Sequence, residues 1–564
     1  MNAPTPALVA RPERLRLVGQ RRQVLALMHQ RLMFAMIVYG GIIALIALRI
    51  LWLAAFGDHA GRKEGVTALI PERGDIVDRE GHPLARTIDA WTISLHPQKV
   101  IGSKLELARN LARLMPDKDE AAYFAMLRSN KSFFYLRRRA PPQLVEAVNA
   151  LGEPGLAIDR EPDRLYPQTS LAAHVVGYTD VDGNGMAGAE RAFQDRLSDP
   201  ALRGKPLVLS ISSRIQQALE NELKAAVTEF SAIGAAGIVM DIHTGEVLAL
   251  TSLPQLNPNV AGQGSPEARF NRATLGVYEL GSTFKPFTVA MAMDSGIIKS
   301  FGKMYPCPQE LHAYGQIIHD THPSGRACSV AEIMKESSNI GTAQIADQIG
   351  RDRQKAFLKK MGFLDPIAIE LMEKGRTLTP GKRWGPFETM TVGYGHAVAV
   401  TPLHLASGYA TLFNGGIYRP ATILKVDRDH AVGKGHRVFS EETSYKMRAL
   451  LRLVVTDGTG RSANAPGYRV GGKTGSAEKY FDRSRLVTSF AGVFPMDEPR
   501  YVIVVMLDEP KATAKTFGFH TAAWNAGPVV SRTISRIAPM LGVRPDKSRE
   551  PNMAEVLPFF HEEK

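Results

Sequence analysis

The pattern of hydrophobic and polar positions begins with an apolar run that carries no charge, LMFAMIVYGGIIALIAL, at 32–48. At about 1.5 Å per residue this run measures about 25 Å, the low end of a bilayer span. After Arg49 the apolar character continues as ILWLAAF to Phe56. The pattern therefore predicts a transmembrane anchor over 32–56, with a cleaved signal peptide as the alternative.

Residues 57–204 have a mixed pattern that predicts a separate, non-catalytic pedestal domain next to the membrane. The stretch IPERGDIVDREGHPLA places two short apolar runs around a polar turn. Apolar positions at helical spacing then predict helices near 104–115, 119–129 and 141–151. We interpret the tripeptide Arg-Gly-Asp at 73–75 as a solvated turn.

From about residue 205 the pattern becomes that of a sheet covered by helices. The stretch PLVLSISSRIQQALENELKAAVTEF predicts a short strand and an amphipathic helix, and GAAGIVMDIHTGEVLALTSLP predicts a hairpin of two apolar strands. Three more strands are predicted from YRVGGKTGSAEK, RLVTSFAGVFP and RYVIVVMLDEP. Helical patterns dominate 275–455, between the two groups of strands, and AAWNAGPVVSRTISRIAPML predicts a final helix.

This order of elements predicts an α/β fold of the α+β kind, in which an antiparallel sheet is flanked by helices on both faces. We assign residues 205–542 to this domain. The tail at 543–564 is polar and contains proline, so it is predicted to be flexible.

Composition and charge add the orientation of the anchor. The chain has 564 residues, of which 44% are hydrophobic and 22% charged, and its formal net charge is +13. Six arginines against one glutamate in residues 1–31 supply part of the excess. Basic residues before a span indicate a cytoplasmic tail at 1–31, with the rest of the chain outside. The sequence has no zinc-finger spacing, aromatic RNA-binding motif or heptad run, so nucleic acid is not predicted as a partner.

Neither a metal nor a cofactor is predicted. The loop DVDGNGMAGAER at 180–191 fits the first positions of a calcium loop, but its twelfth position is Arg191 rather than glutamate. The histidines near Asp320 match no zinc spacing (His312, His319, His322). Cys307 and Cys328 either pair in an oxidising compartment or stay as two buried thiols, and both alternatives remain open.

The stretch YELGSTFKPF carries the first candidate chemistry. Gly281 can form a tight turn, and Ser282 would then stand at the start of a helix. Residues three apart share one helix face, so the amine of Lys285 would lie next to the hydroxyl of Ser282. A serine needs such a base to act as a nucleophile, and lysine serves when burial or positive charge lowers its pKa. The alternative is a helix-capping serine beside a solvated lysine.

Two further motifs have the same polar character. In KESSNIGTAQIA, Ser337 could relay a proton and Asn339 could hold a substrate amide, or both could cap a helix. In VGGKTGSAEK, the residues Lys473, Thr474, Gly475 and Ser476 lie on a predicted strand. Gly475 would leave room for a ligand to pair along the strand, and the lysine and two hydroxyls suit a carboxylate.

Taken together and in this order, Ser-x-x-Lys, Ser-x-Asn and Lys-Thr-Gly resemble the serine-active penicillin-binding proteins and β-lactamases. Longer stretches over about residues 70–535, such as RGDIVDREGHPLA, VYELGSTFKPF and TVGYGHAVAVTPLHLASGYATLFNGG, resemble the class B penicillin-binding proteins, most of all the septal, cell-division type. The sequence departs from the usual pattern at Leu280, where proline is common, and at Ser476, where threonine is frequent.

The resemblance implies a peptidoglycan D,D-transpeptidase. Ser282 would attack the penultimate D-Ala carbonyl of a stem peptide, with Lys285 as its base, and an amine of a neighbouring stem would then take the acyl group. Backbone N–H groups of Ser282 and Ser476 would form the oxyanion hole. The implied catalytic residues are Ser282, Lys285, Ser337, Asn339 and Lys473, and the implied substrate-binding residues are Thr474, Gly475 and Ser476.

The resemblance also implies ligands, partners and a location. β-Lactams would acylate Ser282, and a polytopic division glycan polymerase and other divisome membrane proteins would be partners. The location would be the inner membrane, with the catalytic domain in the periplasm. The alternatives are an elongation-type transpeptidase, and a β-lactam hydrolase or sensor on the same fold. Glu388 lacks the Glu-x-x-x-Asn pattern of a deacylating base and is interpreted as structural.

Overall fold

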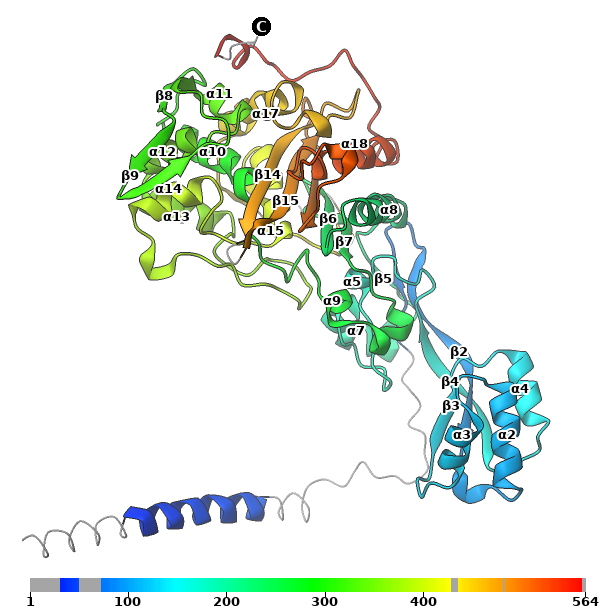
Figure 1. The fold of residues 1–564 in the computed structure, drawn as a ribbon. Helices are drawn as coiled ribbons and strands as arrows, with labels where there is room; N and C mark the ends of the chain where they lie inside the picture. The colour runs from blue at the N-terminus through cyan, green and yellow to red at the C-terminus, as the bar shows by residue number, and fades with distance from the viewer. Residues whose placement is uncertain (1–30, 50–72, 428–434, 480–481, 560–564) are drawn as a thin grey trace, which may run out of the picture. The chain divides into compact units, whose positions relative to one another are not determined.

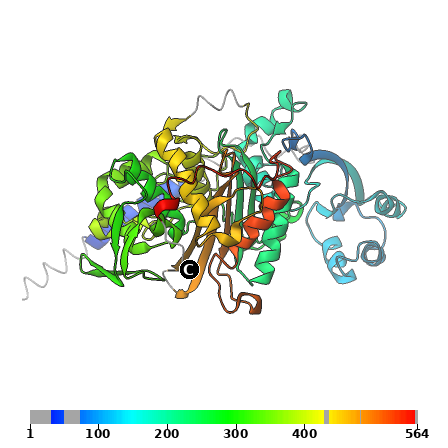
Figure 2. The ribbon, with the colours of Figure 1, turned by 90° about the horizontal axis from the view of Figure 1, so that it is seen from above.

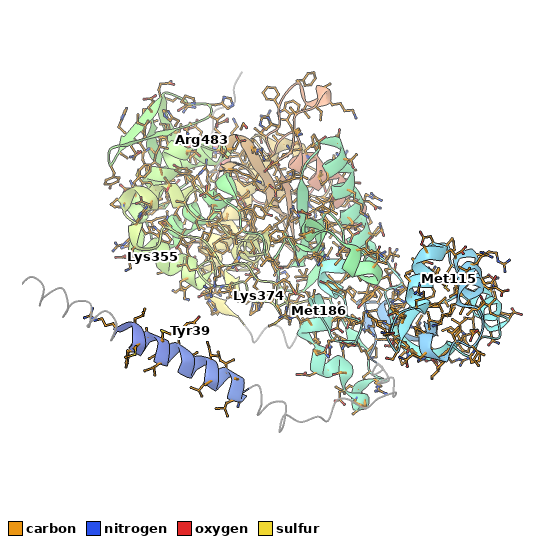
Figure 3. All side chains as sticks on the ribbon, turned by 60° about the horizontal axis from the view of Figure 1, so that its bottom comes forward. Tyr39, Met115, Met186, Lys355, Lys374 and Arg483 are labelled. Atoms are coloured by element: carbon orange, nitrogen blue, oxygen red, sulfur yellow. The ribbon has the colours of Figure 1, made fainter. Side chains whose placement is uncertain are left out.

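The computed structural model describes residues 31–49, 73–427, 435–479 and 482–559. The chain forms two compact units, residues 1–69 and 70–564. Within the first, a helix from Arg31 to Arg49 is apolar and long enough to cross a membrane. Its side chains, Tyr39 among them, project outward around the helix (Figure 3). The rest of the predicted span, at 50–56, and the predicted tail up to residue 30 lie outside the described residues.

The second unit begins with the predicted pedestal, whose sheet carries three helices (Figure 1). The strands follow the order β3-β2-β1-β5, and β4 pairs with β2. The strands are β1 (Ile76–Val77), β2 (Pro83–Leu95), β3 (Phe134–Arg137), β4 (Leu156–Leu165) and β5 (Leu207–Val208). The helices are α2 (Lys104–Leu114), α3 (Glu120–Leu127) and α4 (Pro142–Asn149), close to the predicted ranges. They share an apolar core with β2 that includes Ile93, Leu111 and Tyr123.

The interpretation of residues 73–75 as a solvated turn is wrong. Arg73 is only 4% exposed, and its Nε donates to the carboxylate of Glu190 at 3.0 Å. Arg164 on β4 donates to the same carboxylate at 2.7 Å, and Glu190 is fully buried in α6 (Gly188–Ala192). Two arginines thus pair with one buried carboxylate, and Glu190 ties the start of the unit to β4.

The larger sheet of the second unit is antiparallel and has five strands in the order β14-β15-β16-β6-β7. They are the strands predicted from the sequence: β6 (Gly234–Asp241), β7 (Val247–Leu253), β14 (Gly471–Lys479), β15 (Asp482–Phe494) and β16 (Tyr501–Asp508). β6 and β16 are buried along their whole length, because helices cover both faces.

Helices α8 (Ser213–Glu229) and α18 (Ala526–Ile537) pack on one face of this sheet (Figure 2). The opposite face packs against the helices predicted between the two groups of strands; among them, α15 contacts β6, β15 and β16, and α17 contacts β14. These are α10 (Lys285–Asp294), α11 (Val330–Lys335), α12 (Asn339–Ile349), α13 (Arg351–Lys360), α14 (Pro386–Gly393), α15 (Pro402–Phe413) and α17 (Glu441–Thr456). The prediction of an antiparallel sheet flanked by helices is therefore confirmed.

Two short antiparallel strand pairs between α10 and α11 were not predicted, because each of their strands has only four residues. They are formed by β8 (Met304–Cys307) with β11 (Arg326–Ser329), and by β9 (Glu310–Ala313) with β10 (Gln316–His319). Cys307 and Cys328 lie on the first pair as buried free thiols.

The predicted domain boundaries remain predictions, and two contacts bear on them. β5 pairs in parallel with β1, so Leu207 and Val208 belong to the sheet of the pedestal. In the segment predicted as a flexible tail, Val556 is fully buried and Glu550 pairs with Arg452 at 2.6 Å. The described part of that segment, up to Phe559, thus contacts the domain with the larger sheet.

Candidate active site

Ser282 lies in a 3-10 turn, Gly281–Phe284, and Lys285 is the first residue of α10. The sequence predicted a plain helix start. In a 3-10 turn, residues i and i+3 eclipse one another, so the turn places Ser282 and Lys285 on one side. Gly281 has φ +53°, the left-handed conformation that favours glycine. Ser282 is partly exposed, whereas Lys285 is fully buried.

Strand β14 lies directly against this turn. A Cβ on Gly475 would come within 2.3 Å of the Leu280 carbonyl oxygen and 2.9 Å of Thr283 Cγ2. Glycine at 475 therefore lets the strand approach the turn that carries Ser282 (Figure 1, β14 and α10). Whether it also leaves room for a ligand remains a prediction. Leu280 itself is buried in the core, and its carbonyl accepts the Thr283 hydroxyl at 2.8 Å.

The second motif meets the first through Lys285. The Lys285 Nζ donates to the Ser337 carbonyl oxygen and, at 3.2 Å, to the Ser337 hydroxyl. Ser337 has φ +63°, a conformation that a residue with a side chain adopts at a cost. Ser338, rather than Ser337, caps α12, because its hydroxyl accepts the Gly341 N–H at 2.9 Å. The hydroxyl of Ser337 is therefore not used as the cap of α12 and lies next to the Lys285 amine.

The third motif forms a small polar network on β14. The Lys473 Nζ, fully buried, donates to the Thr459 hydroxyl at 3.1 Å, and the Thr474 hydroxyl donates to the same oxygen at 3.0 Å. Ser476 is exposed, and its hydroxyl accepts the Ala522 N–H at 3.0 Å. Strand β14, at one edge of the sheet, therefore carries the buried amine of Lys473 and the hydroxyls of Thr474 and Ser476.

The electrostatics of the two lysines suit proton transfer. Burial and the charge of Lys473 lower the pKa of Lys285 well below its ordinary value, and Asp320 opposes this. Burial lowers the pKa of Lys473 to about 7, and the charge of Glu336 opposes it. A buried lysine with a lowered pKa can be neutral near pH 7, the state in which its amine accepts a proton.

Asn339 lies at the start of α12 and points toward the β10 hairpin, with its Nδ2 donating to the His319 carbonyl oxygen at 3.0 Å. Asp320 holds this segment: its carboxylate accepts the Ser338 hydroxyl at 2.6 Å and the Ile340 N–H at 3.0 Å. Of the histidines near Asp320 in the sequence, His312 and His319 lie near Glu310.

Sequence reasoning missed Thr459 and the structural role of Asp320. Thr459 follows Gly458, whose Cβ position lies 2.6 Å from the Lys335 carbonyl oxygen, so this loop lies against the end of α11. A polar residue in the loop TDGTG just before the predicted β14 was the available signal. Glu388, which was interpreted as structural, accepts the Gly385 N–H at 2.9 Å at the start of α14.

Comparison with known families agrees with this fold. Residues 235–529 match the penicillin binding protein transpeptidase domain, and residues 68–206 match the penicillin-binding protein dimerisation domain. The two matches follow one another along the chain in the order of the two five-stranded sheets.

Individual proteins are similar over most of their length. The chain is 38% identical to the probable peptidoglycan D,D-transpeptidase FtsI of Caulobacter vibrioides, covering 87% of this chain and 85% of that one. It is 29% identical to the peptidoglycan D,D-transpeptidase FtsI of Escherichia coli, covering 89% and 90%. The solved structure of penicillin-binding protein 3 from Mycobacterium tuberculosis, in complex with aztreonam, matches with a TM-score of 0.65 at 25% identity, covering 84% and 98%.

A transpeptidase domain preceded by a dimerisation domain defines the class B penicillin-binding proteins, and this chain belongs to that family. It is a serine-type, penicillin-binding peptidoglycan D,D-transpeptidase.

Proposed function

We propose that the protein cross-links peptidoglycan stem peptides during septal wall synthesis, through an acyl-serine intermediate on Ser282. The resemblance of VYELGSTFKPF to the septal subclass supports the septal assignment, as does the 38% identity to a relative named FtsI. The elongation-type transpeptidase remains the alternative duty on the same active site.

In the proposed acylation step, the hydroxyl of Ser282 attacks the penultimate D-Ala carbonyl and gives its proton to Lys285. The hydroxyl of Ser337, 3.2 Å from the Lys285 Nζ, then passes a proton to the leaving D-Ala amine. Thr474 and Ser476 would hold the terminal carboxylate beside Lys473, and Asn339 would orient the donor peptide. Backbone N–H groups of Ser282 and Ser476 would stabilise the oxyanion.

One observation carries this mechanism. Lys285 follows Ser282 by three residues, is fully buried and lies next to Ser337, and its pKa is lowered by burial and by Lys473. A neutral amine in that position can act as a base for the serine, whereas a solvated, charged lysine could not.

Labelling with a fluorescent penicillin tests the nucleophile. We expect covalent labelling of the wild type at Ser282 and none of Ser282→Ala. The matched control is Ser535→Ala, which removes an exposed hydroxyl on α18 and should label like the wild type. A wild type that stays unlabelled would contradict the proposal, and rapid turnover of the penicillin would favour the hydrolase instead.

We further propose that the Arg31–Arg49 helix is a single-pass inner-membrane anchor, with a cytoplasmic N-terminus and a periplasmic catalytic domain. The arginines before the helix support this orientation. Partners would be the polytopic division glycan polymerase and other divisome membrane proteins. Imaging of a fluorescent fusion tests the duty: midcell enrichment indicates septal synthesis, and a lateral-wall distribution indicates elongation.

Replacing residues 1–56 by an unrelated anchor tests whether the N-terminal segment recruits the divisome partners. We expect weaker midcell recruitment with penicillin labelling retained. Recruitment and division that remain unchanged would show that the segment serves only as an anchor.

A further inference from the structure

The proposed transpeptidation needs a second substrate, an amine of a neighbouring stem peptide. Such an amine is protonated at neutral pH, and only its neutral form can attack the acyl-Ser282 ester. A site for it must therefore hold a cation beside Ser282 and take a proton from it. The residues Ser282, Lys285, Ser337, Asn339 and Lys473–Ser476 include no carboxylate and no imidazole, so these groups must come from residues around them.

Glu279 and His396 supply both groups next to the serine turn. Glu279 lies three residues before Ser282, and its carboxylate Oε2 is 3.3 Å from His396 Nδ1. The other oxygen, Oε1, accepts the Ala397 N–H at 3.0 Å, which fixes the carboxylate. About a third of each side chain is exposed, 35% for Glu279 and 38% for His396, so a solute can reach the pair.

The loop that carries His396 is held against the serine turn by its backbone. The Gly281 N–H donates to the Gly395 carbonyl oxygen at 3.3 Å, and a Cβ on Gly395 would come within 2.1 Å of the Gly281 carbonyl oxygen. Tyr278 and Val400 form a β-bridge on the other side of the same contact. The pair is thus tied to the residue that precedes Ser282.

Tyr394 extends this site toward the second motif. Its ring lies 5.3 Å from that of His396 and packs with Ile340 and Ala343 of α12. Burial, followed by the charges of Glu279 and Asp320, raises the pKa of Tyr394 to about 12. Two carboxylates therefore act on this part of the site, whereas the Lys473 side carries buried amines, and a cationic substrate is favoured on the Tyr394 side.

We propose that Glu279 and His396 form the receiving site for the acceptor amine. The carboxylate holds the incoming ammonium, and the imidazole takes one proton and releases it to solvent. The neutral amine then attacks the acyl carbonyl and a C–N bond forms. Lys285 takes the second amine proton and returns it to the Ser282 oxygen as the C–O bond breaks. The products are the cross-linking amide and free Ser282. This inference rests on the proposed transpeptidase function.

The test is the partition of the acyl-enzyme between transfer to an amine and hydrolysis. A D-alanyl thioester serves as the donor, and stem tetrapeptides with a lysine or a diaminopimelate amine serve as acceptors for the full-length enzyme in detergent. The ratio of amide to acid is set after the acyl-enzyme forms, so it does not depend on how fast each variant acylates. Loss of one charge-assisted contact should lower this ratio about tenfold or more.

Glu279→Gln keeps an oxygen that can accept the Ala397 N–H and removes the charge, so we expect a lower ratio with an intact fold. His396→Asn should lower the ratio as well. The matched control is Glu388→Gln, which neutralises a carboxylate that also accepts one backbone N–H but lies on α14. Its ratio should equal that of the wild type.

Two outcomes would overturn the inference. If the ratio of amide to acid is unchanged in Glu279→Gln and His396→Asn, the pair only stabilises the turn that carries Ser282 and does not receive the amine. In the second outcome, penicillin labels the wild type but neither amine receives the acyl group. The proposed transpeptidation then fails, and the receiving site fails with it; the first outcome, by contrast, leaves the transpeptidation intact.

Discussion

At the scale of single residues, the two buried lysines are the centre of the candidate site. Lys285 contacts Ser337, Lys473 contacts Thr459, and both amines are fully buried. Each lysine therefore occupies the environment that disfavours its charge, and the charge of Lys473 further disfavours that of Lys285. Through this charge, Lys473 on β14 acts on Lys285 of the first motif.

This coupling predicts a shift in the pH profile of Lys473→Met. In the proposed mechanism acylation needs neutral Lys285, so its rate should fall as the pH drops through the pKa of that amine. Removing the positive neighbour makes protonation of Lys285 easier and raises its pKa. The acidic limb of the penicillin acylation profile should then move to higher pH. Lys299→Met, at an exposed site, is the control and should leave the limb in place. A limb that moves to lower pH would refute the coupling.

At the scale of elements, the close contact between β14 and the serine turn explains the glycine of the third motif. Gly475→Ala places a Cβ where the Leu280 carbonyl oxygen now lies, 2.3 Å away. We expect a loss of about 1–3 kcal/mol in the free energy of unfolding, as for other overpacked cores, and slower penicillin acylation because the turn is displaced.

Thermal unfolding and a labelling time course measure the two effects of Gly475→Ala. Gly262→Ala is the control, because its added Cβ meets no atom within 4 Å. Acylation at the wild-type rate by Gly475→Ala would show that the strand and the turn can separate without consequence for the site.

The pedestal sheet depends on the buried carboxylate of Glu190. Glu190→Gln leaves the charges of Arg73 and Arg164, 4% and 6% exposed, without their partner. Breaking such a buried pair costs about 3–5 kcal/mol. Chemical denaturation should show this loss, and Glu146→Gln, at an exposed position on α4, should show none. A stability equal to that of the wild type would mean that water replaces the lost contacts.

At the scale of the whole molecule, the chain separates into an apolar helix and a unit with cores of its own. We expect the chain without residues 1–56 to remain in the supernatant when membranes are sedimented. It should still be labelled by penicillin, because the apolar cores lie in the second unit. Continued sedimentation with membranes would reveal a second membrane-binding surface on that unit.

The sequence by itself determined the large elements. Alternating, fully apolar and helix-spaced patterns are local properties, so the five strands of the larger sheet, α8, α18 and the pedestal helices could be predicted from short windows. The three candidate motifs could be found in the same way, because each is a short run of polar residues beside an apolar element. Strands of only four residues, such as β8 and β11, are too short to give a clear pattern.

Only the tertiary structure decided which of these residues meet. Four contacts join residues that are not neighbours in the chain: Thr459 with Lys473, Asp320 with Asn339, Glu279 with His396, and Glu190 with Arg73. No local pattern encodes such contacts, because they depend on how the elements pack. Gly475 shows the difference most clearly: the sequence marked it as part of a motif, and the fold gave the reason, a turn that occupies the space of its missing side chain.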